Sequence, residues 1–165
     1  MLIGDSLGVG METKFRSLAK TNDYNPVTHV VSGTSIFQWV TWIKKDLVVH
    51  KPDLVVISLG TNDAVIFDRV KKFPTIYTEF VSQIEETGAV VVWIGPPNIS
   101  SKRIPKITEA RNFIKESVVN FYESEKFETP QGGDGVHSSA SGYNKWMEGV
   151  WSWMEKQKII TKLDN

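Results

Sequence analysis

Two short stretches of this chain are apolar at almost every position. Residues 54–59 read LVVISL, and residues 89–94 read AVVVWI. A strand with one face in water alternates apolar and polar residues, so a strand without alternation is buried on both faces. Strands of that kind are typical of parallel sheets that helices cover on both sides. These two stretches therefore limit the possible folds more than any other feature of the sequence.

Segments with apolar residues at helical spacing separate the expected strands. Further strands are expected at residues 1–3, 26–31 and 126–129. The alternation of strand and helix predicts βαβ units and a mostly parallel sheet with helices on both faces. We expect one domain over residues 1–165. The five helical faces are Leu7, Met11, Phe15 and Leu18; Ile36, Trp39, Val40, Ile43 and Leu47; Ile76, Tyr77, Phe80, Val81 and Ile84; Ile107, Ala110, Ile114, Val118 and Phe121; and Trp146, Val150, Trp153 and Met154.

Charge and composition exclude several classes of protein. The 19 basic residues equal the 19 acidic residues in number, which argues against a nucleic-acid partner because such proteins carry a basic surface. The chain has no cysteine, so disulfides, cysteine metal sites and cysteine nucleophiles are excluded. It holds no apolar run of transmembrane length and no charged-then-apolar leader. We expect a soluble chain without a signal peptide; its compartment and oligomeric state stay open.

Polar loops that contain glycine follow the expected strands. The carboxyl ends of parallel strands lie at one edge of the sheet, which is where such folds place their functional groups. We therefore expect side chains from these loops to meet there. The loops are Gly4-Asp5-Ser6, Ser32-Gly33-Thr34-Ser35, Gly60-Thr61-Asn62-Asp63 and, near the C-terminus, Gly133-Asp134-Gly135-Val136-His137.

Three of these residues are the parts of a nucleophilic triad. A serine hydroxyl is a weak nucleophile until an imidazole takes its proton, so Ser6 needs a base such as His137. Asp134 stands three residues before His137, and one turn can bring its carboxylate to one ring nitrogen while the other faces Ser6. This pattern predicts acyl transfer through an acyl-enzyme.

The same loops supply hydrogen-bond donors for an oxyanion. The backbone N–H of Ser6 lies at a helix start, and glycine at position 33 lets the backbone approach a substrate carbonyl. Asn62 offers a neutral side-chain amide at a strand end. We predict that Ser6, Gly33 and Asn62 form an oxyanion hole.

Each of these residues also has a structural alternative. Ser6 could cap the first helix, and Gly33 could be a turn residue. Asn62 and Asp63 could form a capping Asx turn. His137 could be a structural histidine, although His29 and His50, the other two, fall in a strand and at a helix end. The four loops together favour catalysis.

Two nucleotide-binding motifs are excluded, and a third motif matches only in part. Residues 8–10 read GVG, but position 13 is threonine, so the dinucleotide fingerprint is incomplete; the chain has no GKS or GKT phosphate loop. Residues 4–8 read GDSLG and match the nucleophile elbow of α/β-hydrolases. In those enzymes several strands precede the elbow, whereas here Ser6 follows the first strand.

The four loops resemble the four sequence blocks of the SGNH (GDSL-type) hydrolases. The first block is similar to Gly4-Asp5-Ser6-Leu7, the second to Gly33, the third to residues 60–63 and the last to residues 134–137. The resemblance implies a three-layer α/β/α sandwich with a flavodoxin-like parallel sheet of about five strands. It implies ester hydrolysis without metal or cofactor, with Ser6 as nucleophile, His137 as base and acid, and Asp134 as its orienter. The first strand is unusually short for this family.

The substrate is less constrained than the mechanism. The family includes lipases, lysophospholipases, thioesterases and carbohydrate deacetylases, and specificity is expected in residues 64–73 and 96–105. The second of these loops is polar and basic, which favours a short acyl group, such as acetyl, on a small-molecule or carbohydrate ester. Two alternatives stay open: action on longer acyl chains, with Phe67, Phe73 or Trp39 lining the pocket, and a catalytically silent carbohydrate-binding module.

Overall fold

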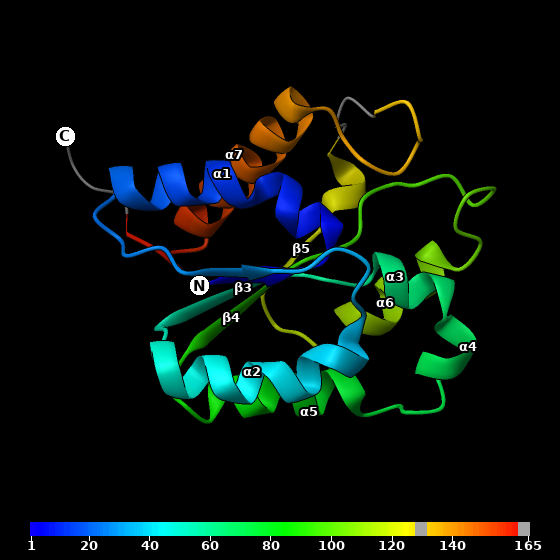
Figure 1. Cartoon of the computed structure of the whole chain (residues 1–165), viewed down its shortest axis with the longest axis horizontal. Coiled ribbons are helices and arrows are strands. Elements are labelled where there is room, and N and C mark those ends of the chain that lie inside the picture. The colour runs from blue at the N-terminus through cyan, green and yellow to red at the C-terminus, as the bar shows by residue number, and fades with distance from the viewer. Residues whose placement is uncertain (128–131, 162–165) are drawn as a thin grey trace.

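Five parallel strands form one sheet in the order β2-β1-β3-β4-β5 (Figure 1). The computed structural model describes residues 1–127 and 132–161. This strand order is flavodoxin-like, and it reverses direction between β1 and β3, the point at which such sheets place their ligand sites. The predicted three-layer α/β/α fold is confirmed. The strands are β1 (Leu2–Gly4), β2 (Thr28–Val30), β3 (Leu54–Ser58), β4 (Val90–Ile94) and β5 (Phe121–Tyr122).

The first strand is short but paired on both sides. Leu2 lies opposite Thr28 of β2 and Val56 of β3, and Gly4 lies opposite Ser58. A Cβ atom at position 4 would lie 2.6 Å from the Ser58 carbonyl oxygen, so only glycine fits this contact. The close contact fixes the start of the next loop against β3.

Helices α1 (Ser6–Thr21) and α7 (Ala140–Lys156) cover one face of the sheet, as Figure 1 shows in blue and orange. Met11, Trp146 and Met154 are fully buried between these helices and the sheet. The two helices approach closely at Gly10, where a Cβ atom would lie 2.3 Å from the Tyr143 ring. The first and last helices of the described chain are therefore packed directly against each other.

The opposite face is covered by α2 (Ile36–His50), α5 (Ile76–Glu85) and α6 (Ile107–Lys115) (Figure 1). Trp39, Trp93 and Phe80 are fully buried in this layer. The Trp93 indole N–H donates to the Leu59 carbonyl oxygen over 3.0 Å, which satisfies its polar group inside the core. In the described residues, no helix is both long enough and apolar enough to cross a bilayer.

The fifth strand lies earlier in the sequence than predicted. Strand β5 is Phe121–Tyr122, whereas Lys126 belongs to the 3-10 helix η1 (Ser124–Lys126); residues 128–129 of the prediction lie outside the described part. The helix predicted to include Val118 and Phe121 ends at Lys115. Both of these residues are buried, so their spacing imitated a helical face although neither lies in the helix.

The stretch after β3 is helical where residues 64–73 were expected to form a loop. It holds two short helices, α3 (Thr61–Val65) and α4 (Phe67–Val70). Helices of four or five residues are too short to show a helical period in sequence. Figure 1 shows both at the same end of the sheet as the loop that follows β4.

Candidate active site

Ser6, His137 and Asp134 form a continuous chain of hydrogen bonds. The Ser6 Oγ lies 2.9 Å from His137 Nε2, and His137 Nδ1 lies 2.6 Å from Asp134 Oδ2. An ionised carboxylate can only accept a hydrogen bond, so the proton of a neutral imidazole belongs on Nδ1. Nε2 is then free to accept the proton of the serine hydroxyl.

Asp134 organises the loop that carries the histidine. Its Oδ1 accepts the backbone N–H groups of Val136 and His137, each over 2.9 Å. The side-chain bond from His137, followed by these two backbone bonds, holds the pKa of Asp134 well below its usual range. Asp134 therefore stays ionised and keeps the imidazole in one orientation.

The start of α1 leaves the Ser6 hydroxyl available. The helix is capped by Asp5, whose carboxylate accepts the Leu7 N–H over 2.9 Å. The alternative role of Ser6 as N-cap is therefore taken by its neighbour. As the first residue of α1, Ser6 also has a backbone N–H without a partner inside the helix.

The three predicted oxyanion donors come from neighbouring strand ends. Asn62 lies in α3, directly after β3, and its Nδ2 donates to the Thr34 carbonyl oxygen over 2.9 Å and to Asp5 Oδ2 over 3.4 Å. Gly33 is exposed with φ +77°, a backbone conformation that favours glycine. The Gly33 N–H donates no hydrogen bond within residues 1–127 and 132–161.

A buried carboxyl group joins the second and third loops. Asp63 is fully buried, and its Oδ1 accepts the N–H of Ile36 at the start of α2 over 2.9 Å. Burial raises the pKa of Asp63 to about 7, and burial likewise raises the pKa of Asp5 to about 7. Asp63 thus fixes the position of the segment that follows Gly33.

Two further side chains, Thr34 and Trp39, support the Gly33 loop through contacts that were not predicted. Thr34 Oγ1 donates to the Val31 carbonyl oxygen over 2.7 Å, and the Trp39 indole N–H donates to Thr34 Oγ1 over 3.0 Å. Trp39 is fully buried, so it does not line an open acyl pocket. Both contacts depend on tertiary packing, which a helical period does not reveal.

The remaining histidines lie away from Ser6. His29 Nδ1 lies 2.7 Å from Asp46 Oδ2, and its ring stacks on Trp42 at 5.8 Å. His50 is exposed at the end of α2. Among the described residues, no three histidine, aspartate or glutamate side chains gather as a metal site.

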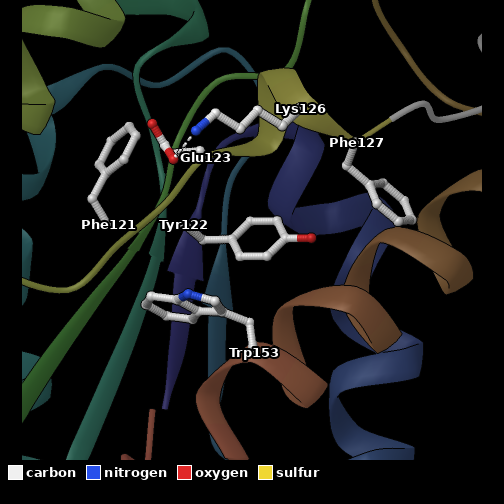
Figure 2. Close-up of a pocket in the computed structure, with 6 residues that line it drawn as sticks. All are labelled: Phe121, Tyr122, Glu123, Lys126, Phe127 and Trp153. Atoms are coloured by element: carbon white, nitrogen blue, oxygen red, sulfur yellow. Dashed lines mark hydrogen bonds and ion pairs between the residues drawn. The ribbon is translucent and has the colours of Figure 1, made fainter. Parts of the chain in front are cut away.

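Three cavities in the described part of the chain are separate from this constellation. Cavities of about 240, 410 and 370 Å³ are present, and none has Ser6, Asn62 or His137 in its lining. The smallest lies at the edge strand β5, where Tyr122 and Trp153 meet edge to face and the Glu123–Lys126 ion pair lies beside them (Figure 2). None of these three cavities is therefore part of the candidate active site.

Solved structures share this fold at low sequence identity. TesA is 20% identical over 94% of this chain and 97% of its own, with a TM-score of 0.76. The psychrotrophic esterase EstA from Pseudoalteromonas sp. is 19% identical over 96% and 98%, with a TM-score of 0.72. The acetyl xylan esterase AlAXEase is 18% identical over 92% and 98%, with a TM-score of 0.77. The expected likeness to the SGNH (GDSL-type) hydrolases is thereby confirmed for the fold.

Comparison of the sequence with known proteins and families finds one family. No curated protein matches the chain. The family described as "Protein of unknown function (DUF459)" matches residues 1–132, a range that includes Ser6, Gly33 and Asn62 and ends before Asp134 and His137. Because this match covers well over half of the sequence, the chain belongs to the DUF459 family.

Proposed function

We propose that this protein hydrolyses carboxylic esters through an acyl intermediate on Ser6. The observation that carries the proposal is the pair of short contacts from Ser6 Oγ to His137 Nε2 and from His137 Nδ1 to Asp134 Oδ2, at 2.9 and 2.6 Å. A nucleophile, a base and an orienting carboxylate in this arrangement suit acyl transfer. The shared fold with esterases supports the proposal.

In the first half of the reaction, Ser6 Oγ attacks the ester carbonyl carbon while its proton moves to His137 Nε2. Asp134 stabilises the imidazolium that forms. The carbonyl oxygen becomes an oxyanion, which accepts hydrogen bonds from the N–H groups of Ser6 and Gly33 and from the Asn62 amide. When the carbon–oxygen bond to the alcohol breaks, His137 returns the proton to the leaving oxygen and the acyl group stays on Ser6.

In the second half, water replaces the alcohol. His137 Nε2 takes a proton from the water as its oxygen attacks the acyl carbon. Collapse of the second tetrahedral intermediate releases the carboxylic acid, and the proton returns to Ser6 Oγ. No group besides those of this chain and water is needed for the atoms and charges to balance.

The proposed substrate is a short acyl group, such as acetyl, on a carbohydrate or another polar alcohol. In the loop after β4, Ile99 and Ile104 are buried against Ala64, so this loop turns its apolar side chains inward. Lys102 and Arg103 are exposed, so this loop presents a polar surface rather than an apolar acyl-binding channel. Among the proteins of the same fold, AlAXEase is an acetyl xylan esterase, which supports the choice.

Action on longer acyl chains is the second candidate. The observation in its favour is an aromatic pair: Phe37 of α2 and Phe73, which follows α4, meet edge to face with their ring centroids 5.4 Å apart. The Phe73 side chain is half exposed, and an acyl chain could lie along it. An open aromatic surface of this kind holds a long chain less firmly than an enclosed pocket does.

The deciding experiment combines a substrate panel with a nucleophile variant. Purified protein is assayed on p-nitrophenyl esters from acetyl to octanoyl and on acetylated xylan, beside Ser6→Ala and the control Ser17→Ala, an exposed serine of α1. The proposal expects hydrolysis that Ser6→Ala abolishes and Ser17→Ala retains, and a serine-directed phosphonate that labels Ser6 in mass spectra. A folded wild type that hydrolyses no ester and binds acetylated polysaccharide would instead favour the silent binding module.

A further inference from the structure

Six exposed basic side chains lie on two segments at the Ser6 end of the sheet. Residues 67–72 and 97–106 contain one acidic residue, Asp68, although the whole chain has equal numbers of basic and acidic residues. Figure 1 shows α4 and the loop after β4 at the same end of the molecule as the loop ahead of α7. We call this set the basic rim; it consists of Arg69, Lys71, Lys72, Lys102, Arg103 and Lys106.

A small apolar cluster packs one segment of the basic rim against the loop that carries Asp134 and His137, which we call the catalytic loop. Ile99 and Ile104 of the loop after β4 pack with Ala64 of α3, and Val136 packs against the same cluster. Val136 directly precedes His137. The burial of Ile104 in this cluster holds the backbone of its neighbour Arg103 close to the loop that carries His137.

Arg103 lies against the backbone of the catalytic loop. Its Nε is 3.7 Å from the position that a Cβ atom would take at Gly135, two residues before His137. Within the described residues, neither Arg103 nor Lys102 forms an ion pair. The ionised Asp134 of the same loop forms no ion pair with this arginine; its oxygens bond to His137 and to the Val136 and His137 N–H groups.

Other members of the rim are partly neutralised. Lys71 pairs with Asp68 at 2.7 Å, and Lys106 pairs with Glu109 at 2.9 Å. The pKa of Asp68 lies below its usual range, mainly because of the hydrogen bond from Lys71 and to a smaller extent because of the charge of Lys106. The two segments therefore lie within electrostatic reach of each other. In the described part of the chain, four members of the rim form no ion pair: Arg69, Lys72, Lys102 and Arg103. Of these four, Arg103 lies against the loop that carries His137.

We propose that Arg103, assisted by Lys102, binds an anionic group of the ester substrate, a carboxylate or a phosphate. This inference rests on the proposed ester hydrolysis and adds the charge of the substrate to it. The planar guanidinium matches both anions through paired N–H donors, while an ammonium acts as a compact charge. Exposed cations beside a reactive centre also raise the rate at which anionic ligands reach it, and salt weakens this electrostatic attraction.

The test uses matched charged and neutral esters. For the carboxylate, 4-acetoxybenzoate is compared with 4-acetoxybenzamide; for the phosphate, acetylglycerol 3-phosphate is compared with acetylglycerol. The wild type should have a higher kcat/KM on the anionic member of at least one pair, and added salt should reduce that preference. Arg103→Gln should lower the anionic-to-neutral ratio about tenfold, the effect of losing one charge-assisted hydrogen bond. Arg103→Lys should keep part of the ratio, and the distant control Lys45→Gln all of it.

Two results would overturn the inference while leaving ester hydrolysis intact. One is a kcat/KM that Arg103→Gln changes on neither ester of a pair. The other is an equal loss on both esters, which would mean that Arg103 only supports the His137 loop. The affinity of the Ser6→Ala variant for the same esters, measured by calorimetry, tests recognition without turnover. Equal affinity for charged and neutral esters there would overturn the inference even if the wild type hydrolysed neither.

Discussion

The Asn62 side-chain amide donates to the Thr34 carbonyl oxygen over 2.9 Å and so joins the loop after β3 to the loop after β2. Its second proton faces Asp5 Oδ2 at the longer distance of 3.4 Å. A developing oxyanion can compete with this weaker contact, since a well-formed hydrogen bond is shorter. Asn62 is therefore oriented before substrate arrives and still has a donor to offer.

Asn62→Ala should lower kcat about a hundredfold or more, the usual effect of losing one oxyanion donor. KM should change much less, because the donor acts on charge that appears only in the transition state. Steady-state kinetics on p-nitrophenyl acetate measure both, and circular dichroism verifies the fold. A raised KM with an unchanged kcat would show that Asn62 binds only the ground-state substrate.

Lowering the pH from about 7.5 to 5 should stabilise the protein through Asp5 and Asp63. Burial raises the pKa of each to about 7, above the value of roughly 4 for an unfolded aspartate. In this window the folded state binds more protons, so its free energy of unfolding rises as the pH falls. The gain should end near pH 4, where the unfolded chain also takes up these protons.

Asp63→Asn isolates one of these two groups. The amide oxygen can still accept the Ile36 N–H, but it does not titrate. The variant should lose up to about 1.4 kcal/mol per pH unit of the dependence, the linkage slope of one proton. Urea unfolding at several pH values measures the slope, with the exposed Asp68→Asn as control. Identical slopes in wild type and Asp63→Asn would contradict the buried, proton-binding state of this carboxyl.

Trp39→Phe should loosen the Gly33 loop. The change keeps most of the buried ring but removes the indole hydrogen bond to Thr34 Oγ1, a loss of about 1 kcal/mol in unfolding free energy. We expect kcat to fall several-fold with little change in KM. Trp42→Phe, on the same helix, is the matched control, since the Trp42 indole N–H donates no hydrogen bond in the described part of the chain. Equal effects of the two variants would argue against a positioning role for Trp39.

Activity should survive EDTA, because the proposed steps use only groups of this chain and water. Loss of activity on chelation, restored by zinc or manganese, would refute the serine mechanism. This measurement depends on neither acyl length nor substrate charge.

The kcat/KM should fall as the acyl chain grows from acetyl to octanoyl. The surface around Lys102 and Arg103 is polar and exposed, and it offers a long chain little apolar area to bury. A rise with chain length would leave the mechanism intact and move the protein toward thioesterase or lysophospholipase activity. Phe73→Ala would then be expected to reduce the rate on octanoyl esters more than on acetyl esters.

The sequence predicted those parts of the fold that burial alone specifies. The runs at residues 54–59 and 89–94 became β3 and β4 because strands covered on both faces must be apolar throughout. Strand β5 has only two residues, and the neighbouring Val118 continued a helical spacing, so its position was predicted wrongly. Helices α3 and α4 were missed because they are shorter than two turns.

The residues of the candidate site could be predicted where polar loops follow the expected strands. Ser6, Asn62 and the Asp134–His137 pair stood in polar loops at strand ends, and a family resemblance linked them. The contact of Asp63 with the Ile36 N–H and that of Trp39 with Thr34 join residues through the folded core. No local pattern encodes such contacts, because they depend on how α2 packs against β1 and β3.

The hydrogen bond between Ser6 and His137 spans 131 positions of the chain. Closing a loop of this length costs entropy that the close packing of α1 on α7 at Gly10 and Tyr143 must offset. Ser6 is synthesised 131 positions before His137, so a nascent chain holds the serine without its proposed base until α7 docks. If the proposed activity is found, its return during refolding would therefore time the docking of α7 on α1.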